Sequence, residues 1–195
     1  MCIRDRNNII RFGNFTLTSG KNSSYYVDLR LIPSYPHQFR KMIKNLQNLI
    51  VEKTGLDDFD CLASVPTGGL VVTSALAIEI VKPLIYVRSK PKEHGTTKSI
   101  EGKISAGMKV VMIDDVMTTG TSVLNGINQL KEAELLVSDL YVIINRLEGG
   151  DKALSDIGVQ THQLTDILEI RDILFQEKLI DKEIFEKITT QVNRN

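Results

Sequence analysis

The sequence lacks several features that would assign the protein to a specialised class. Its two cysteines, Cys2 and Cys61, form neither a disulfide framework nor a CxxC metal motif, which favours a reducing compartment. No apolar run of about 18 residues predicts a membrane helix, and the first residues lack the apolar stretch of a signal peptide. The 24 Lys and Arg balance the 24 Asp and Glu, so net charge indicates neither a nucleic-acid nor a membrane-surface protein. We expect a cytoplasmic protein that binds small molecules.

The chain has enough apolar residues for one closed core. Hydrophobic residues make up 42% of 195 residues, and no repeat, low-complexity tract or long linker divides them. We therefore expect a single domain over residues 1–195. Residues 1–6 follow no helical or strand period, so we also expect the natural N-terminal element to be missing or altered.

Short apolar runs alternate with helical patterns between residues 59 and 164, as in a parallel α/β sheet. The predicted strands are 59–64, 84–88, 109–114, 140–145 and 159–164. The predicted helices between them cover about 70–80, 122–133 and 151–157. A further amphipathic helix over about 39–50 should cover one face of the sheet, and the alternating segments 12–17 and 25–29 predict a hairpin outside it. We expect a hood at about 9–32, a core at about 36–175, and two C-terminal helices at about 166–192.

The most informative segment combines a buried strand with acidic and hydroxyl side chains. Val110–Ile113 is apolar, Asp114 and Asp115 follow at the edge where α/β sheets bind ligands, and Thr118–Ser122 leads into a helix. Backbone N–H groups and hydroxyls at a helix start can hold a phosphate, while the carboxylates would face hydroxyls or a cation. A ribose 5-phosphate offers both kinds of group. The alternative is that the aspartates only cap the next helix.

Two other nucleotide-binding folds lack their phosphate-binding motifs here. The sequence contains no GxxxxGKS or GxxxxGKT loop, and no GxGxxG follows a predicted strand. P-loop and Rossmann proteins are therefore excluded.

Residues 110–122 resemble the phosphoribosyl pyrophosphate motif of type I phosphoribosyltransferases. The resemblance implies that family's fold, a central, mostly parallel sheet flanked by helices, with a small hood formed by the N-terminal hairpin and adjoining segments. It also implies that Asp114 and Asp115 hold the ribose hydroxyls. The residues implied to hold the 5-phosphate are Thr118, Thr119, Gly120, Thr121 and Ser122.

The hairpin region, residues 12–30, is similar to the hood of the orotate-using members of this family. The similarity implies that Tyr25, Tyr26 and Lys21 contact orotate, together with Thr118 from the motif. Members often have Lys where this chain has Thr18, and Lys21 lies nearby. Both tyrosines could equally be ordinary strand aromatics at a domain junction.

Residues 88–102 form a polar, basic connection that is similar to the catalytic loop of the same orotate enzymes. The similarity implies that Arg88, Lys92 and His94 reach the pyrophosphate, with Lys92 and His94 catalytic beside the two aspartates. Many members have Lys directly after the Arg, whereas this chain has Ser89 and then Lys90, which could substitute. In the family this loop enters the neighbouring subunit's site, which implies a homodimer with shared active sites. Taken alone, the segment would suit a solvated surface loop.

Two further segments complete the expected site. Arg146 follows an apolar strand, and its planar guanidinium suits the ring carboxylate of orotate, which an Arg recognises at this place in the family. An ion pair with Glu148 is the alternative. Thr67 and Gly68 lie between a strand and a helix, where backbone amides favour pyrophosphate.

The implied reaction transfers phosphoribosyl from phosphoribosyl pyrophosphate to N1 of orotate, giving orotidine 5′-monophosphate and pyrophosphate in pyrimidine biosynthesis. Mg²⁺ is the expected cofactor, held by pyrophosphate oxygens and water rather than by protein ligands. A purine-using transferase is the nearest alternative. A regulator that senses phosphoribosyl pyrophosphate and binds RNA or DNA is a second, which the balanced charge disfavours.

Overall fold

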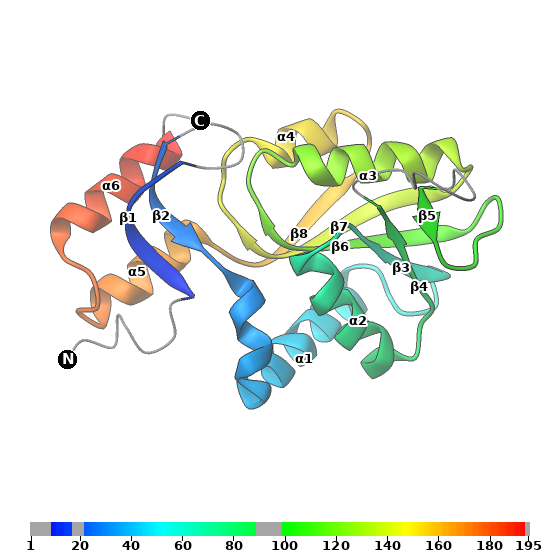
Figure 1. Cartoon of the computed structure of the whole chain (residues 1–195), viewed down its shortest axis with the longest axis horizontal. Coiled ribbons are helices and arrows are strands. Elements are labelled where there is room, and N and C mark those ends of the chain that lie inside the picture. The colour runs from blue at the N-terminus through cyan, green and yellow to red at the C-terminus, as the bar shows by residue number, and fades with distance from the viewer. Residues whose placement is uncertain (1–8, 17–21, 89–98, 194–195) are drawn as a thin grey trace.

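A computed structural model of the protein describes residues 9–16, 22–88 and 99–193. Its centre is a six-stranded sheet with the order β5-β4-β3-β6-β7-β8 (Figure 1). The strands are β3 (Cys61–Ser64), β4 (Leu84–Val87), β5 (Ile100–Glu101), β6 (Lys109–Met117), β7 (Leu136–Asn145) and β8 (Gln160–Asp166). All neighbours are parallel except β5, which runs antiparallel to β4. This arrangement confirms the predicted fold class.

Helices cover both faces of the sheet. The helices α1 (Pro36–Lys53) and α2 (Gly68–Ile80) lie on one face, and α3 (Thr121–Glu132) and α4 (Gly150–Ser155) lie on the other (Figure 1). Helix α1 begins at Pro36, which suits a first helical position, and buries Ile43, Leu46 and Ile50, which repeat at helical spacing. Each face has its own apolar cluster, and β6 contributes Val111 to one cluster and Met112 to the other.

Beside the sheet, the two ends of the described chain form a second layer of structure. The hairpin strands β1 (Ile10–Thr16) and β2 (Asn22–Val27) are antiparallel, and the C-terminal helices α5 (Ile167–Gln176) and α6 (Lys182–Asn193) lie against them (Figure 1). A 3-10 helix, η2 (Leu29–Ser34), connects β2 to α1. We call the hairpin together with α5 and α6 the hood. The sequence predicted the hairpin but not its packing against α6.

Several strand boundaries differ from the prediction, including the start of β7, which lies at Leu136 and not at residue 140, and one strand was not predicted. The strand β6 continues to Met117, three residues beyond the predicted end, because Val116 and Met117 remain paired with Ile144 and Asn145 of β7. Asp115 therefore lies within the strand together with Asp114, and not after it. The two-residue β5 was not predicted, since so short a segment has no detectable period.

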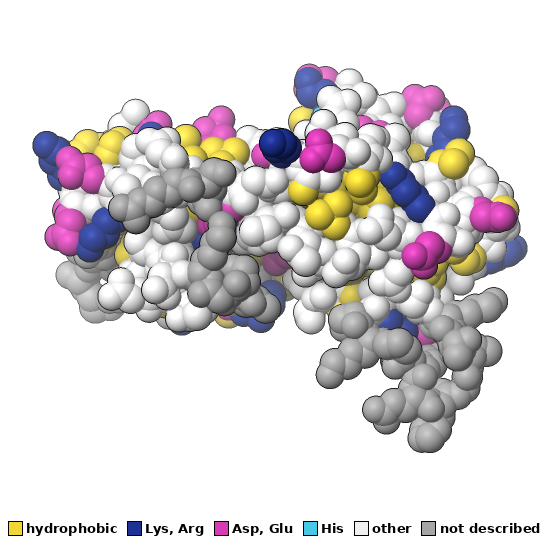
Figure 2. Space-filling view, turned by 90° about the horizontal axis from the view of Figure 1, so that it is seen from above, with side chains coloured by type: hydrophobic (Ala, Val, Ile, Leu, Met, Phe, Trp, Pro, Cys, Tyr) yellow, Lys and Arg dark blue, Asp and Glu magenta, His cyan; other side chains and the backbone are white. Residues whose placement is uncertain are grey.

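The surface seen from the side of α3 and α4 carries no single-sign face. In that view, basic and acidic side chains are interspersed and apolar side chains form small groups between them (Figure 2). None of the helices in the described ranges is long and apolar enough to cross a membrane.

Candidate active site

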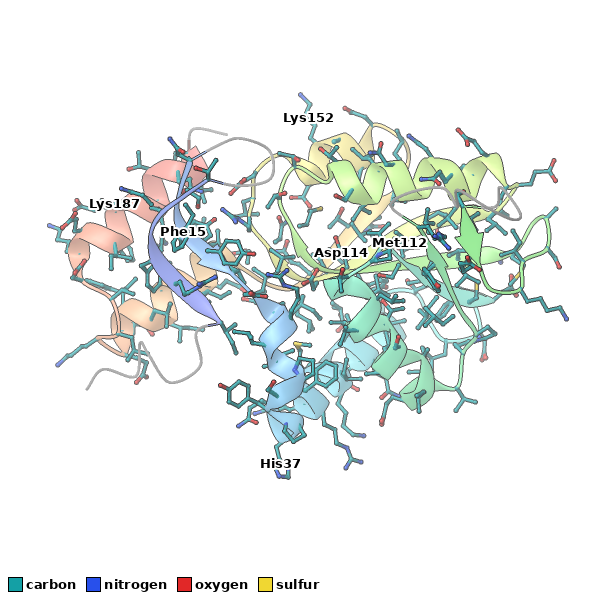
Figure 3. All side chains as sticks on the ribbon, viewed as in Figure 1. Phe15, His37, Met112, Asp114, Lys152 and Lys187 are labelled. Carbon is teal, nitrogen blue, oxygen red and sulfur yellow. The ribbon has the colours of Figure 1, made fainter. Side chains whose placement is uncertain are left out.

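Asp114 lies towards the end of β6 that faces the hood (Figure 3), and Asp115 is the next residue of the same strand. Asp114 is 9% exposed, and its Oδ1 accepts a hydrogen bond from the backbone N–H of Asp115 at 3.0 Å. The start of α2 approaches both carboxylates closely. A Cβ at Gly68 would collide with the Asp115 carboxylate, and one at Gly69 would lie 2.5 Å from Asp114 Oδ1. Only glycine therefore allows α2 to begin against this acidic pair.

Burial sets the electrostatics of the pair. It raises the pKa of Asp114 well above its ordinary value, and the neighbouring carboxylate of Asp115 raises it further. Burial also raises the pKa of Asp115, against the lowering effect of hydrogen bonds and of the more distant Arg30. Two adjacent carboxylates with this little compensation are suited to bind hydroxyl donors or a cation, and ribose supplies two hydroxyls.

The loop after β6 forms a concave pocket of about 220 Å³ beside the carboxylates. It is lined by Asp114, Val116, Met117 and each residue from Thr118 to Val123. Gly120 adopts φ = +74° immediately before α3, and the hydroxyls of Thr119 and Thr121 lie 2.9 Å apart. This pocket joins a helix start to several hydroxyl groups, which is the chemistry that a phosphate requires.

A larger cleft of about 480 Å³ separates the hood from the sheet. Its lining comes from the hairpin, η2, the start of α2, β6 with the loop after it, and the residue after β7. The lining residues are Thr16, Tyr26, Val27, Asp28, Arg30, Thr67, Gly68, Asp115, Val116, Thr118 and Arg146. Arg30 donates to both carboxylate oxygens of Asp28 and to the Tyr26 hydroxyl at 3.0 Å. The cleft thus brings the predicted ribose, pyrophosphate and orotate residues to one place.

Arg146 forms the ion pair with Glu148 that the sequence allowed, and it also lies at the cleft where the sequence predicted a contact with orotate. Its guanidinium pairs with Glu148, with Nε and Nη2 at 3.0 and 2.8 Å from Oε1, and it also lines the cleft. Nη2 donates to the Ser23 hydroxyl at 3.0 Å, and the guanidinium carbon lies 4.4 Å from the centre of the Tyr25 ring. The arginine is therefore held from several sides at the edge of the cleft.

The two tyrosines of the hairpin occupy different environments. Tyr26 lines the cleft, whereas Tyr25 is fully buried against Arg146 and is not among the lining residues. Burial raises the pKa of Tyr25 to about 12. Alternation along β2 explains the difference, since successive side chains point to opposite faces of a strand. Tyr26 is therefore placed to meet a substrate ring, and Tyr25 is placed to support Arg146.

Comparison with known proteins identifies the family. The model of the phosphoribosyl transferase domain matches residues 37–172. The orotate phosphoribosyltransferase of Cenarchaeum symbiosum is 46% identical over 179 residues, which cover 92% of this chain and 90% of that protein. The chain belongs to the orotate phosphoribosyltransferase family. The orotate phosphoribosyltransferase of Staphylothermus marinus is 35% identical, covering 97% of this chain and 91% of its own. The crystal structure of the Aeropyrum pernix orotate phosphoribosyltransferase superimposes with a TM-score of 0.79 at 31% identity, covering 89% and 97% of the two chains.

Other residues predicted for an orotate phosphoribosyltransferase lie at different places. Thr67 and Gly68 line the cleft, and the peptide bond between Pro66 and Thr67 is cis. Arg88 follows β4 directly and pairs with Glu101 at 3.1 Å, and it is not among the residues that line the cleft. Lys21, Lys92 and His94 fall outside the described residues, as do Ser89 and Lys90.

Sequence reasoning missed several residues that this family member brings to its cleft. Asp28 and Arg30 lie in the hairpin segment that was singled out, yet only the structure shows that they reach the cleft. Ser23 and Gln191 contact each other across 168 positions, with Nε2 of the glutamine 3.0 Å from the serine hydroxyl. No periodicity links residues so distant in one sequence.

Proposed function

We propose that this orotate phosphoribosyltransferase transfers the phosphoribosyl group of phosphoribosyl pyrophosphate to N1 of orotate and releases pyrophosphate. The observation that carries the proposal is the 480 Å³ cleft, in which the carboxylate of Asp115, the ring of Tyr26 and the guanidinium of Arg146 share one lining. The ribose would lie against Asp115 and the buried Asp114. The orotate ring would lie towards Tyr26 with its carboxylate towards Arg146.

The charges in the cleft suit a substitution at C1 of the ribose. As pyrophosphate leaves, positive charge develops on the sugar, and the carboxylates of Asp114 and Asp115 would stabilise it in surroundings of low dielectric constant. The pocket of residues 118–123 would hold the 5-phosphate at a fixed distance from C1. The protein's contribution is thus to orient both substrates and to exclude water.

Mg²⁺ is the cofactor that we propose, bound mainly through pyrophosphate oxygens and water. The donor chemistry near the cleft fits a hard cation, since Asp114 and Asp115 offer carboxylate oxygens there. In the described parts of the chain, no group of three or more His, Cys, Asp or Glu side chains could hold a metal. The ion would supply positive charge for the departing pyrophosphate.

Lys92 is proposed to stabilise the departing pyrophosphate, with Arg88 and His94 assisting. The support is the resemblance of residues 88–102 to the family's catalytic loop. Replacing Lys92 with Ala should lower kcat far more than it raises either KM, because the charge it meets develops only in the transition state. Steady-state kinetics would measure this, and an unchanged kcat would remove Lys92 from the mechanism.

We further propose that the protein is a homodimer with shared active sites and that it acts in the cytoplasm. The dimer is supported by the same family resemblance and by exposed apolar residues on α2. Val71 and Ile78, two helical turns apart on α2, are 37% and 82% exposed, and Val81, the residue that caps the end of the helix, is 87% exposed. The cytoplasm is supported by a sequence with two cysteines and no disulfide pattern.

Orotate absorbance provides the direct test of the proposed reaction. Purified protein with phosphoribosyl pyrophosphate and Mg²⁺ should deplete orotate, and hypoxanthine or uracil in parallel reactions should persist. Both additions should be required. Turnover of hypoxanthine without turnover of orotate would reassign the base specificity and the role of Arg146. If none of the three bases were consumed, the result would contradict the proposed reaction.

A further inference from the structure

Gln191, near the end of α6, contacts the residues that hold Arg146. Its Nε2 lies 3.0 Å from the Ser23 hydroxyl and 3.3 Å from Glu148 Oε1. Its Oε1 accepts from the backbone N–H of Ser24 at 3.0 Å and from the Ser24 hydroxyl at 3.1 Å. One side chain of the C-terminal helix thus joins the hairpin to the end of β7.

Chemistry fixes the orientation of this amide. A backbone N–H can only donate and the ionised carboxylate of Glu148 can only accept, so the oxygen must face Ser24 and the nitrogen must face Glu148. Reversing the amide would place donor against donor at one end and acceptor against acceptor at the other. Gln191 therefore has one favourable orientation.

The partners of Gln191 are the same groups that hold the guanidinium of Arg146. Ser23 and Glu148 each bind Arg146 and each bind Gln191. The side chains of Arg146 and Glu148 are 3% and 2% exposed, and Ser23 is 3% exposed. In such a network, a change at one member shifts the others, because Arg146 and Gln191 share the same partners.

The guanidinium has one nitrogen left for a ligand. Nε and Nη2 bind Glu148 and Ser23, and among the described residues no hydrogen bond is made by Nη1. Arg146 lines the cleft, so the orientation of its guanidinium plane determines where Nη1 can meet an anion. The strength of a hydrogen bond from Nη1 to a carboxylate depends on the direction of its N–H bonds, and that orientation sets the direction.

We propose that Gln191 is a positioning residue for the base substrate, acting through Ser23 and Glu148 to fix the plane of Arg146. This inference rests on the proposed function and extends it, because it makes the C-terminal helix a determinant of orotate affinity. Gln191 lines neither the cleft nor the phosphate pocket. It should therefore affect the binding of orotate and not that of phosphoribosyl pyrophosphate.

Two substitutions separate positioning from simple attachment of α6 to the hairpin. Gln191→Met conserves volume but removes every hydrogen bond. Gln191→Glu keeps an acceptor for Ser24 but replaces the donor to Glu148 with a negative charge. If the amide acts through its donor, both variants should raise the KM for orotate about tenfold or more, as expected for lost hydrogen bonds to a charged group. The KM for phosphoribosyl pyrophosphate should stay near that of the wild type.

Gln176→Met is the matched control, since Gln176 is an exposed glutamine on the neighbouring α5. Calorimetry with orotidine 5′-monophosphate provides a second measurement, and its Kd should rise in both Gln191 variants and not in the control. Thermal unfolding would identify a variant that fails to fold. If Gln191→Met fails to fold, Gln191→Glu still tests the positioning role, because its carboxylate can accept the hydrogen bonds of Ser24.

The outcomes separate this inference from the proposed function. A wild-type protein that does not consume orotate would overturn both. An active wild type together with a Gln191→Glu variant of unchanged orotate KM and unchanged Kd would overturn the positioning role alone. Equal increases in the KM of both substrates would also overturn it, because they would indicate general damage to the cleft.

Discussion

The buried pair Asp114 and Asp115 combines two requirements that oppose each other. Binding ribose hydroxyls favours ionised carboxylates, whereas burial disfavours their charge and raises both pKa values. Ionising these carboxylates therefore costs free energy at the position where the substrate needs their charge. Such opposition between stability and function is common at active sites.

Replacing Asp114 with Asn should abolish turnover and stabilise the free protein. The raised pKa means that ionising Asp114 costs more in the folded than in the unfolded state. This cost is absent below the ordinary pKa of the carboxyl and grows as the pH rises towards the folded-state value. At about pH 7 the variant should melt about 2–4 °C higher for each kcal/mol of cost removed.

Calorimetric melting at two pH values checks this sign. The advantage of Asp114→Asn should shrink at about pH 4, where protonation removes much of the cost from the wild type. A variant less stable than the wild type at neutral pH would contradict the prediction.

At the scale of elements, the start of α3 concentrates phosphate-binding groups in one turn. Thr121→Val removes a hydroxyl from the 220 Å³ pocket while keeping the shape of the side chain. Its loss should raise the KM for phosphoribosyl pyrophosphate about tenfold or more, as expected for a hydrogen bond to a charged group, with little change for orotate. Steady-state kinetics with each substrate varied in turn would measure both values.

Thr161→Val is a suitable control for Thr121→Val. The Thr161 hydroxyl is buried without a hydrogen-bond partner in the described chain and lies on β8, outside the phosphate pocket. Kinetic constants should remain those of the wild type. Equal effects of the two substitutions would argue against a specific role for Thr121.

The elements differ in how far the sequence could predict them. The buried strand before Asp114 was predictable from its continuous apolar run, and α3 was predictable from apolar residues at helical spacing. The packing of α6 on β2 was not, since it depends on contacts between distant residues such as Ser23 and Gln191. For the same reason, the sequence left two alternatives for Arg146, an ion pair with Glu148 and recognition of the orotate carboxylate. The structure shows the ion pair and also places Arg146 in the lining of the cleft.

At the scale of the whole molecule, the proposed homodimer predicts that the exposed apolar face of α2 lies in the subunit interface. Ile78→Glu on α2 should convert the dimer to a monomer. The side chain of Ile78 is 82% exposed, so a charged residue is tolerated there in the monomer, but its burial in an apolar interface would be unfavourable. Orotate turnover should fall with the loss of the dimer, since the active sites are proposed to be shared. Light scattering coupled to size-exclusion chromatography, followed by activity measurement, would test both statements.

Leu136→Glu provides the control for the dimer surface. Leu136 is also an exposed apolar residue, 57% exposed, but it begins β7 and not α2. It should leave mass and activity unchanged. An Ile78→Glu variant with the mass of the wild type would exclude this face of α2 from the interface.

The shared construction of the hood has a consequence for biosynthesis. An isolated two-stranded hairpin is marginally stable at best, and β2 receives its glutamine partner from a residue translated 168 positions after Ser23. A nascent chain can therefore complete the sheet, the acidic pair and the phosphate pocket while the orotate side of the cleft still lacks its support. On the proposed assignment, the ribosome completes the phosphoribosyl side of the cleft first, and the support of Arg146 by Gln191 follows with α6.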